Sequence, residues 1–293
     1  MKLSKFRLDI PRDLILQYPR DSRDASRLMV VHKDTGKIEH RCFGDVCTYI
    51  DEDDVLVLND TKVFSAYLLG YKEKTGARID VTLLRELRLE QHYWDVLVEP
   101  ARKVRVGNKI FFNDEALVAE VIDNTTSRGR ILCFHFDGSS EELRYMIEAI
   151  GKAPIPSELG RESTQEDRNR YQTVYADRPG AITAPSAGLH FTQYLLKRLE
   201  VQGVQLSKIT LHMGLGNRLP VNVEDLTKFK MNSEEYVVPE SSTKTINQAL
   251  NNNNKVIAVG VSTAKALESN VTCLLYTSPS PRDRQKYRMP SSA

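Results

Sequence analysis

The stretch Asp51-Glu52-Asp53-Asp54-Val55-Leu56-Val57-Leu58-Asn59-Asp60-Thr61-Lys62 gives the strongest indication of the fold. An acidic cluster precedes the apolar run Val55–Leu58, and polar residues follow it. A short run that is apolar at every position is typical of a buried central strand. Because ligands gather at the carboxyl edge of α/β sheets, we expect the side chains of residues 59–62 to border a site.

Mixed helical and strand patterns surround this strand and predict an α/β main domain. The segment 192–200 has apolar residues at helical spacing, with Thr192 as the N-cap and Gly203 as the stop. The other elements predicted for this domain are a helical turn opened by Pro11, a hairpin with arms at 27–32 and 38–42, a strand at 206–213, a helix at 244–251 and a strand at 255–260.

The segment from about Ala66 to Asp137 has a different pattern, because short runs of β-forming residues recur at even spacing between turn residues. This pattern favours a small antiparallel β-barrel inserted into the main domain. We therefore divide the chain into a mixed α/β domain at 1–65 and 141–272, an inserted barrel domain at 66–140 and a tail at 273–293.

The composition is that of a soluble globular protein, with 41% hydrophobic and 27% charged residues in 293. The chain lacks an apolar run long enough for a membrane span, and its N-terminus lacks the apolar core of a signal peptide, so we expect a cytoplasmic protein. Its four cysteines form no CxxC pair, which predicts neither a metal site nor a disulfide framework. Packing in a reducing compartment is their simplest role.

The tail 273–293 shows neither helical nor strand periodicity. It carries a net charge of +3, against +2 for the whole chain, so the remainder stands at −1. The tail resembles translated sequencing-adaptor sequence fused to a gene fragment, and we exclude it from the fold. The alternative is a genuine disordered basic tail.

Two neighbouring stretches are rich in polar, aromatic and small residues, namely Arg170–Ala176 (RYQTVYA) and Ala184–Thr192 (APSAGLHFT). They neither alternate like a strand nor carry the charge of a linker, which indicates a backbone shaped around a ligand. Gly188 permits close backbone approach, and His190 precedes a predicted helix whose N-terminus favours an anion. The alternative for His190 is a histidine that caps or packs against the loop.

Further candidates lie at predicted strand ends. Thr210–Gly216 places His212 and two glycines where a nucleoside or its charged group fits, although ordinary strand-to-loop turns share this spacing. Leu219 stands where a dinucleotide fingerprint needs its third glycine, which disfavours that fold. Asp60 beside Lys62 fits a residue that positions a substrate or moves a proton, or else a polar turn with a surface ion pair.

Charged residues give weaker indications. Glu234 or Glu235 fits an acid or base, or else an ordinary surface glutamate. Because the net charge without the tail is near zero, any nucleic-acid surface must be a local cationic patch, and a solvated face is the alternative for each cluster. The two clusters are Arg102, Lys103, Arg105 and Lys109 on the insert, and Arg161, Arg168 and Arg170 before the first aromatic stretch.

Ordered motifs from about Leu8 to Ser269 resemble those of the S-adenosylmethionine:tRNA ribosyltransferase-isomerases of queuosine biosynthesis. The resemblance implies an α/β domain interrupted by a small β-barrel. It also implies that the ribosyl group of S-adenosylmethionine is transferred and isomerised onto 7-aminomethyl-7-deazaguanine in tRNA, giving epoxyqueuosine-tRNA, adenine and methionine. Besides the two stretches above, the motifs are Ser26–Leu28, Leu56–Val63, Thr210–His212 with Gly214 and Gly216, Pro220-Val221, Ala258–Gly260 and Leu267–Ser269.

On this resemblance S-adenosylmethionine is a consumed substrate, no cofactor or metal is expected, and the partner is tRNA carrying the precursor base. We expect a monomer without membrane contact. We hypothesise that His190, His212 and Asp60 are catalytic and enclose one ribosyl-sized cavity. The substrate-binding candidates are Tyr171, Gln172, Thr173, Ser186, Gly188, Thr192, Gly214 and Gly216, and the tRNA-binding candidates are Arg102, Lys103, Arg105, Arg168 and Arg170.

The chain departs from the family pattern at several positions. Asn232 stands where histidine is usual and Lys265 where arginine is usual, and segments 155–158, 216–218 and 261–263 also differ. Lysine lacks the bidentate fork of arginine. A second hypothesis is therefore a catalytically impaired relative that binds RNA or a nucleoside without turnover. A conventional methyltransferase is a third, disfavoured because no glycine-rich loop follows an early strand.

Overall fold

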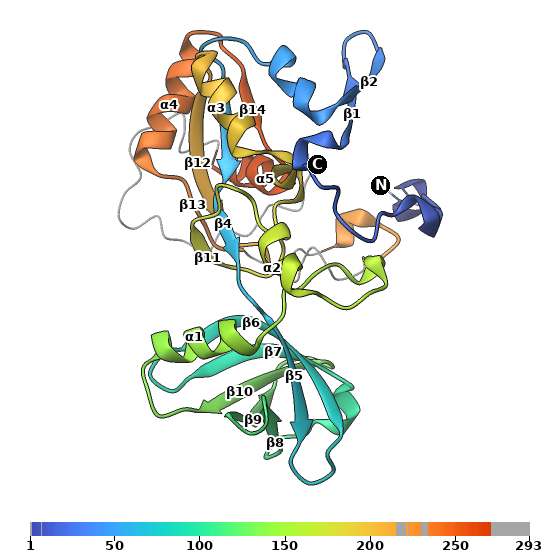
Figure 1. The fold of residues 1–293 in the computed structure, drawn as a ribbon, viewed down its shortest axis with the longest axis vertical. Coiled ribbons are helices and arrows are strands. Elements are labelled where there is room, and N and C mark those ends of the chain that lie inside the picture. Colours follow the sequence, from blue (N-terminus) through green and yellow to red (C-terminus); the bar gives the residue numbers. More distant parts are fainter. Residues whose placement is uncertain (1, 7, 215–220, 222, 230–233, 271–293) are drawn as a thin grey trace. The chain divides into compact units, whose positions relative to one another are not determined.

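The computed structural model describes residues 2–6, 8–214, 221, 223–229 and 234–270. The chain divides into two compact units (Figure 1). The sheet unit combines residues up to 62 with those from 172 onward, and the barrel unit comprises residues 63–171. This division differs from the boundaries predicted at 65/66 and 140/141, because the return segment 141–171 groups with the barrel.

Contacts at the start of the barrel explain this difference. The backbones of Tyr67 and Lys152 exchange hydrogen bonds of 2.8 and 3.3 Å. The carboxylate of Glu148 accepts from the backbone N–H and the hydroxyl of Ser65, at 2.8 and 2.9 Å. These bonds tie helix α1 (Ser140–Ile150) and the residues after it to the first barrel strand.

A four-stranded sheet with the order β13-β12-β3-β14 forms the centre of the sheet unit. β3 (Val55–Asn59) lies between β12 (Gln205–Leu211) and β14 (Val256–Ala258) and runs parallel to both. The short β13 (Tyr236–Val237) is antiparallel to β12. Every residue of β3 is buried, which confirms the predicted central strand.

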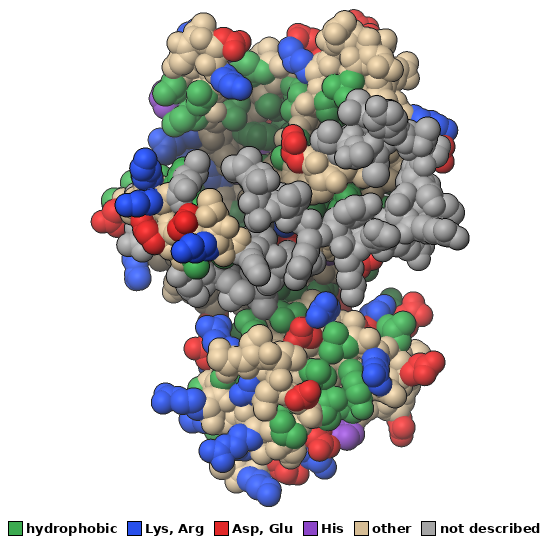
Figure 2. Space-filling model, turned by 180° about the vertical axis from the view of Figure 1, so that it is seen from behind, with side chains coloured by type: hydrophobic (Ala, Val, Ile, Leu, Met, Phe, Trp, Pro, Cys, Tyr) green, Lys and Arg blue, Asp and Glu red, His purple; other side chains and the backbone are tan. Residues whose placement is uncertain are grey.

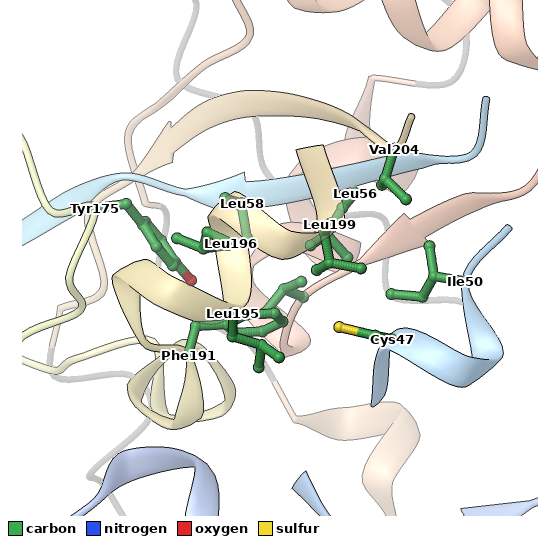
Figure 3. Close-up of a cluster of buried hydrophobic side chains, with 11 residues drawn as sticks. Cys47, Ile50, Leu56, Leu58, Tyr175, Phe191, Leu195, Leu196, Leu199 and Val204 are labelled. Atoms are coloured by element: carbon green, nitrogen blue, oxygen red, sulfur yellow. The ribbon is translucent and has the colours of Figure 1, made fainter. Parts of the chain in front are cut away.

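The two faces of β3 pack against different helices, as the two-residue period of a strand requires. Leu56 and Leu58 contact side chains of α3 (Gln193–Val201) and of the 3₁₀ turn η4 (Phe43–Tyr49), in the cluster drawn in Figure 3. Val55 and Val57 belong to a second cluster, which includes residues of α4 (Glu240–Asn251) and α5 (Val261–Ser269). The central strand is therefore covered on both faces.

Local signals predicted several elements of the sheet unit correctly. The Thr192 hydroxyl accepts from the N–H of Leu195 at 3.0 Å and caps α3, and Gly203 follows the helix at φ +92°. β1 (Arg27–Val31) and β2 (Ile38–Cys42) form the predicted hairpin. A second two-stranded sheet pairs β4 (Thr61–Val63) with β11 (Arg178–Ala181). The remaining short 3₁₀ turns are η1 (Leu3–Phe6), η2 (Arg12–Leu14), η3 (Arg23–Ala25), η7 (Ser186–His190) and η9 (Leu226–Lys228).

The barrel unit holds a closed antiparallel barrel with the strand order β10-β7-β6-β5-β8-β9, as predicted. Its interior is filled by large, fully buried side chains such as Phe112, Phe134 and Leu83. The strands are β5 (Tyr67–Lys72), β6 (Arg78–Arg88), β7 (Tyr93–Glu99), β8 (Lys109–Phe112), β9 (Leu117–Asn124) and β10 (Gly129–His135), with η5 (Ala101–Lys103) after β7, and η6 (Ser157–Leu159) and α2 (Gln165–Arg170) after α1.

The mixed α/β fold with an inserted barrel is thus confirmed. Among the helices of the described residues, none has both the length and the apolar character that crossing a bilayer demands.

Candidate functional site

The carboxyl edge of the parallel sheet brings together Asp60, His212 and Gly214 from the residues predicted for the site. β3, β12 and β14 run in the same direction, so the residues after each strand meet at this edge. Asn59–Thr61 end the first strand, Thr210–Gly214 the second and Gly260–Thr263 the third. Asn59 forms hydrogen bonds there with Leu211 and Ser262, which lie about 150 and 200 positions further along the chain.

Asn59 holds this edge together. Its side chain is fully buried and its amide nitrogen donates to the carbonyl of Leu211 and to the hydroxyl of Ser262, both at 3.0 Å. Its amide oxygen accepts from the N–H groups of Leu211 at 3.0 Å and of Thr61 at 3.2 Å. One side chain therefore fixes the ends of β3 and β12 and the start of α5 relative to one another.

Asp60 lies at the same edge and is only 6% exposed. Its carboxylate accepts a 2.6 Å hydrogen bond from the hydroxyl of Thr210 on the neighbouring strand. Its backbone carbonyl accepts from the N–H groups of Asp177 at 2.8 Å and of Arg178 at 3.2 Å. The carboxylate is therefore held in a fixed place, and the bonds to residues 177 and 178 bring the segment of β11 over the sheet edge.

His212 is the second titratable group at this edge. Its Nδ1 lies 2.8 Å from the hydroxyl oxygen of Thr61, which is fully buried. Burial of the ring lowers the pKa of His212 below its ordinary value, although the carboxylates of Glu235 and Asp60 act in the opposite direction. The imidazole is consequently neutral at pH 7.

The two ring nitrogens of His212 have different surroundings. Nδ1 is engaged by Thr61, whereas Nε2 has no hydrogen-bond partner among the residues that the structure describes. A neutral imidazole with one nitrogen held in this way presents the other for proton transfer. The arrangement suits a base that accepts a proton at Nε2.

Gly180 on β11 lies against the His212 ring. A Cβ atom at this position would approach three ring atoms, Nδ1, Cε1 and Cγ, to 2.8–2.9 Å, and the backbone has φ +150°. Any side chain here would push the ring aside, so only glycine allows β11 to cover it so closely. Thr61 and Gly180 together fix both the position and the rotation of the imidazole.

Within the sheet unit, the first aromatic stretch from Gln172 onward packs closely against the second stretch at Gly188. A Cβ atom on Gly188 would lie 2.1 Å from the hydroxyl of Tyr175 and 2.9 Å from the Thr173 methyl group. The hydroxyls of Thr173 and Tyr175 are buried and find no hydrogen-bond partner in the described part of the chain. Burial raises the pKa of Tyr175, so this phenol stays protonated. The close neighbour of Gly188 is thus the side chain of Tyr175, and the predicted approach of its backbone to a ligand stays a prediction.

His190 lies at the end of η7, and its ring packs on Phe43 with centroids 5.2 Å apart. No hydrogen bond or ring contact within the described residues joins it to Asp60 or His212. Of the other candidates nearby, Ser186 is exposed and Thr192 caps α3. The structure thus places Asp60 and His212 at the same sheet edge, each bonded to a close sequence neighbour of the other, and gives His190 a packing partner of its own.

The remaining substrate-binding candidates are dispersed. Tyr171 ends α2 in the barrel unit, and Gln172 is the first residue of the returning sheet unit; both are half-buried. The N–H of Gly214 donates to the carboxylate of Glu234 at 3.1 Å, and the other oxygen of that carboxylate lies 2.5 Å from the ammonium of Lys265. Glu234 is therefore buried in an ion pair, so the surface position considered for it is wrong. Gly216 and Asn232 lie outside the described residues.

The predicted tRNA-binding cations divide into two kinds. Arg102, Lys103 and Arg105 are exposed on and after η5. Arg168 instead donates to the backbone carbonyls of Ala149, at 3.1 Å, and of Gly151, which closes the end of α1, and Arg170 is half-buried. The exposed η5 cations thus remain the more accessible of these candidates. Among the described residues, no cluster of three or more His, Cys, Asp or Glu side chains is placed to hold a metal ion.

Three positions matter most to this geometry: Asn59 and Thr61 were predicted only as members of the stretch 59–62, and Gly180 was not predicted. Asn59 and Thr61 flank Asp60, but a polar stretch after a strand does not reveal which members turn inward. Gly180 follows Arg178-Pro179, where a glycine reads as an ordinary turn residue. The sequence signal for Asn59 and Thr61 is their position on either side of Asp60. Because successive side chains of an extended chain point to opposite sides, both should point away from the side of the Asp60 carboxylate.

The fold and the site define an α/β enzyme with its polar groups at the carboxyl edge of a parallel sheet and a barrel inserted in the chain. A family model described as queuosine biosynthesis protein matches residues 3–290. The chain belongs to this family. The match runs into the tail 273–293, which lies outside the described residues, so its foreign origin stays a prediction.

Two relatives of known name agree with this assignment. A protein of Flavobacterium psychrophilum named S-adenosylmethionine:tRNA ribosyltransferase-isomerase is 55% identical over 273 residues, which cover 93% of this chain and 78% of the relative. A protein of the same name from Cytophaga hutchinsonii is 51% identical over 272 residues, with the same coverage. A crystal structure of S-adenosylmethionine tRNA ribosyltransferase from Thermotoga maritima is 29% identical, with a TM-score of 0.42 and coverage of 91% of this chain and 73% of that one.

Proposed function

We propose that this chain transfers and isomerises the ribosyl group of S-adenosylmethionine onto the 7-aminomethyl-7-deazaguanine base of tRNA. The products are epoxyqueuosine-tRNA, adenine and methionine. The observation that carries the proposal is the identity of 51–55% with relatives of that name over 93% of the chain. S-adenosylmethionine is a consumed substrate here, no cofactor takes part, and the enzyme acts as a cytoplasmic monomer.

The chemistry assigns a role to the groups at the sheet edge. The precursor amine attacks only when neutral, so its proton must pass to a base. We assign this role to Nε2 of His212, because burial keeps that imidazole neutral at pH 7 and Thr61 holds the other nitrogen. The Asp60 carboxylate, fixed by Thr210, orients the substrate or accepts a proton in turn.

The remaining predicted residues border the substrates in this proposal. His190 completes the ribosyl site and protonates the departing adenine, which leaves more readily as the neutral base. Tyr171 and Gln172 position a nucleobase. The other contacts to the substrates come from Thr173, Ser186, Gly188, Thr192, Gly214 and Gly216, and those to the tRNA backbone from Arg102, Lys103, Arg105, Arg168 and Arg170.

The identity over nearly the whole chain does not favour the catalytically impaired relative. The Lys265 ammonium also finds a carboxylate partner in Glu234, so its difference from arginine leaves no unpaired charge at this position.

The experiment that tests the proposal incubates the chain with tRNA carrying the precursor base and with S-adenosylmethionine. Free adenine and the mass of the modified nucleoside are then followed over time. The proposal requires one adenine for each ribosyl group gained by the tRNA. Binding of tRNA without adenine release contradicts it and supports the impaired relative, and a gain of only a methyl group indicates a methyltransferase.

A further inference from the structure

Arg130 carries a buried charge that the proposed chemistry does not use. Its side chain rises from β10 inside the barrel unit and the residue is only 7% exposed. No carboxylate among the described residues pairs with it. Burying an unpaired guanidinium is expensive unless its donors are satisfied. Arg130 satisfies them with backbone carbonyls, at 2.7–3.4 Å, of Ala101, Val104, Thr126 and Gly129.

Two of these carbonyls belong to the loop around η5. Nη2 donates to Ala101 at 2.9 Å and to Val104 at 3.0 Å, and Nε donates to Val104 at 3.0 Å. The guanidinium therefore clamps both ends of the loop from beneath, with the fork geometry that only arginine has. The neighbouring Arg102, Lys103 and Arg105 are exposed to solvent.

The exposed cations of this loop, Arg102, Lys103 and Arg105, have no ion-pair partner among the described residues, whereas several arginines elsewhere in the barrel unit do. Elsewhere, Arg85 lies 3.6 Å from Asp95, Arg144 lies 2.5 Å from Glu86 and Arg128 lies 3.7 Å from Glu99. Over the face of the unit seen in Figure 2, Lys and Arg side chains are interspersed with acidic ones. An anion-binding surface must therefore be local.

A fourth cation joins the loop. The ammonium of Lys72 on β5 donates to the carbonyl of Lys103 at 2.9 Å. Lys72, Arg102, Lys103 and Arg105 thus form a cationic platform, which we name the η5 platform. Cations held by a fixed backbone bind phosphate with less loss of conformational entropy than cations on a loose loop.

We propose that the η5 platform binds the phosphate backbone of RNA and that Arg130 is its positioning residue. The inference rests on the proposed function for the choice of RNA as the polyanion. Phosphate contacts of this kind contribute affinity and register without reading sequence. Each contact also releases counterions, which gives it a measurable salt dependence.

The test measures binding of fluorescent tRNA by anisotropy over a range of salt concentrations, without S-adenosylmethionine, so that a failure to turn over does not affect it. The variant combines Arg102→Ala, Lys103→Ala and Arg105→Ala. At about 0.7–0.9 per lost phosphate contact, the slope of log K against log salt should fall in magnitude by about 2–3. An unchanged slope would overturn the proposal.

A matched variant combines Arg85→Ala, Arg88→Ala and Arg144→Ala and removes the same charge from the same unit. Arg85 and Arg88 lie on β6 opposite the start of β7, whereas η5 follows its end. We expect this variant to keep the wild-type slope. Equal losses in the two variants would mean that general charge attracts the tRNA, and the platform would be refuted.

Arg130→Lys tests the positioning role, because lysine keeps the charge but cannot clamp both ends of the loop. Faster amide hydrogen exchange at residues 101–105 and a weaker salt slope are expected. A variant with wild-type exchange and wild-type slope would remove Arg130 from the proposal. If Arg130→Lys unfolds the barrel, the alanine variants still decide whether the platform binds RNA.

Discussion

The hydrogen bond between Thr61 and His212 offers a sharp test of how the site is built. Thr61→Val removes the hydroxyl and keeps the shape of the side chain, which is fully buried. The lost bond, 2.8 Å long, leaves Nδ1 of His212 in a buried place without its partner. A buried hydrogen bond contributes about 0.5–1.5 kcal/mol, and leaving one partner unpaired costs about 1–3 kcal/mol.

If the reactive orientation of the His212 ring becomes less stable by about 1.4 kcal/mol, the rate falls tenfold. We therefore expect kcat for adenine release to fall about tenfold, with KM nearly unchanged because Thr61 is not among the proposed substrate contacts. The hydroxyl also stabilises the imidazolium, so its removal lowers the pKa of His212 further. The limb of the kcat/KM profile that reports this base should move to lower pH.

The assay is steady-state adenine release as a function of pH, with Thr61→Ser as the control that restores the hydroxyl. Nitrogen NMR of labelled histidine adds a direct readout, because the wild-type ring should hold its proton on Nδ1 and the valine variant should not. A valine variant with wild-type kcat and an unmoved pH limb would refute the reasoning. So would a serine variant as impaired as the valine variant.

Three further predictions concern Gly180, His190 and the ion pair of Asp167. Gly180→Ala should lower kcat by about tenfold to a hundredfold, because the new Cβ atom would displace the His212 ring. The control Gly36→Ala, at φ +68° with open space around it, should affect only stability, and equal kcat values in the two variants would contradict the prediction. His190→Ala should lower turnover by about a hundredfold, and near-wild-type turnover with a reduced free energy of unfolding would assign the ring to packing on Phe43 alone. The hydrogen-bonded ion pair with Arg161 lowers the pKa of Asp167 to about 2. The ionised carboxylate therefore adds about 2 kcal/mol to the free energy of unfolding above pH 4, and this stabilisation is lost as pH falls toward 2. In urea unfolding, Asp167→Asn should be less stable than the wild type at pH 7 and about equally stable near pH 2.

Much of the fold was predictable because short-range patterns determine it. The run Val55–Leu58 is apolar at every position, and only a strand covered on both faces suits it. The even spacing of β-forming runs in the insert predicted a barrel for a similar reason, since alternating residues fill its interior. Thr192 was predictable as a cap from its chemistry alone.

The partners that build the site were not predictable, because they join residues far apart in sequence. Thr61 touches a ring 151 positions away, and nothing in its neighbourhood indicates that its hydroxyl turns toward β12. Glu234 resembles a surface glutamate in the sequence, because its partners Lys265 and the Gly214 amide lie 31 and 20 positions away. The end of the barrel unit was misplaced because the bonds of Glu148 and Lys152 to the first barrel strand leave no local signal.

The proposed mechanism requires Asp60 and His212 to act on the same substrate from one sheet edge. A double-mutant cycle on single-turnover adenine release tests this directly. Asp60→Asn keeps an oxygen that accepts from Thr210, and His212→Asn keeps a polar group near the position of Nδ1 while removing Nε2. We predict that each variant loses at least about a hundredfold in rate and that the double variant is little worse than either, with a coupling free energy above about 1 kcal/mol. Single variants that retain most of the activity, or losses that simply add, would contradict it.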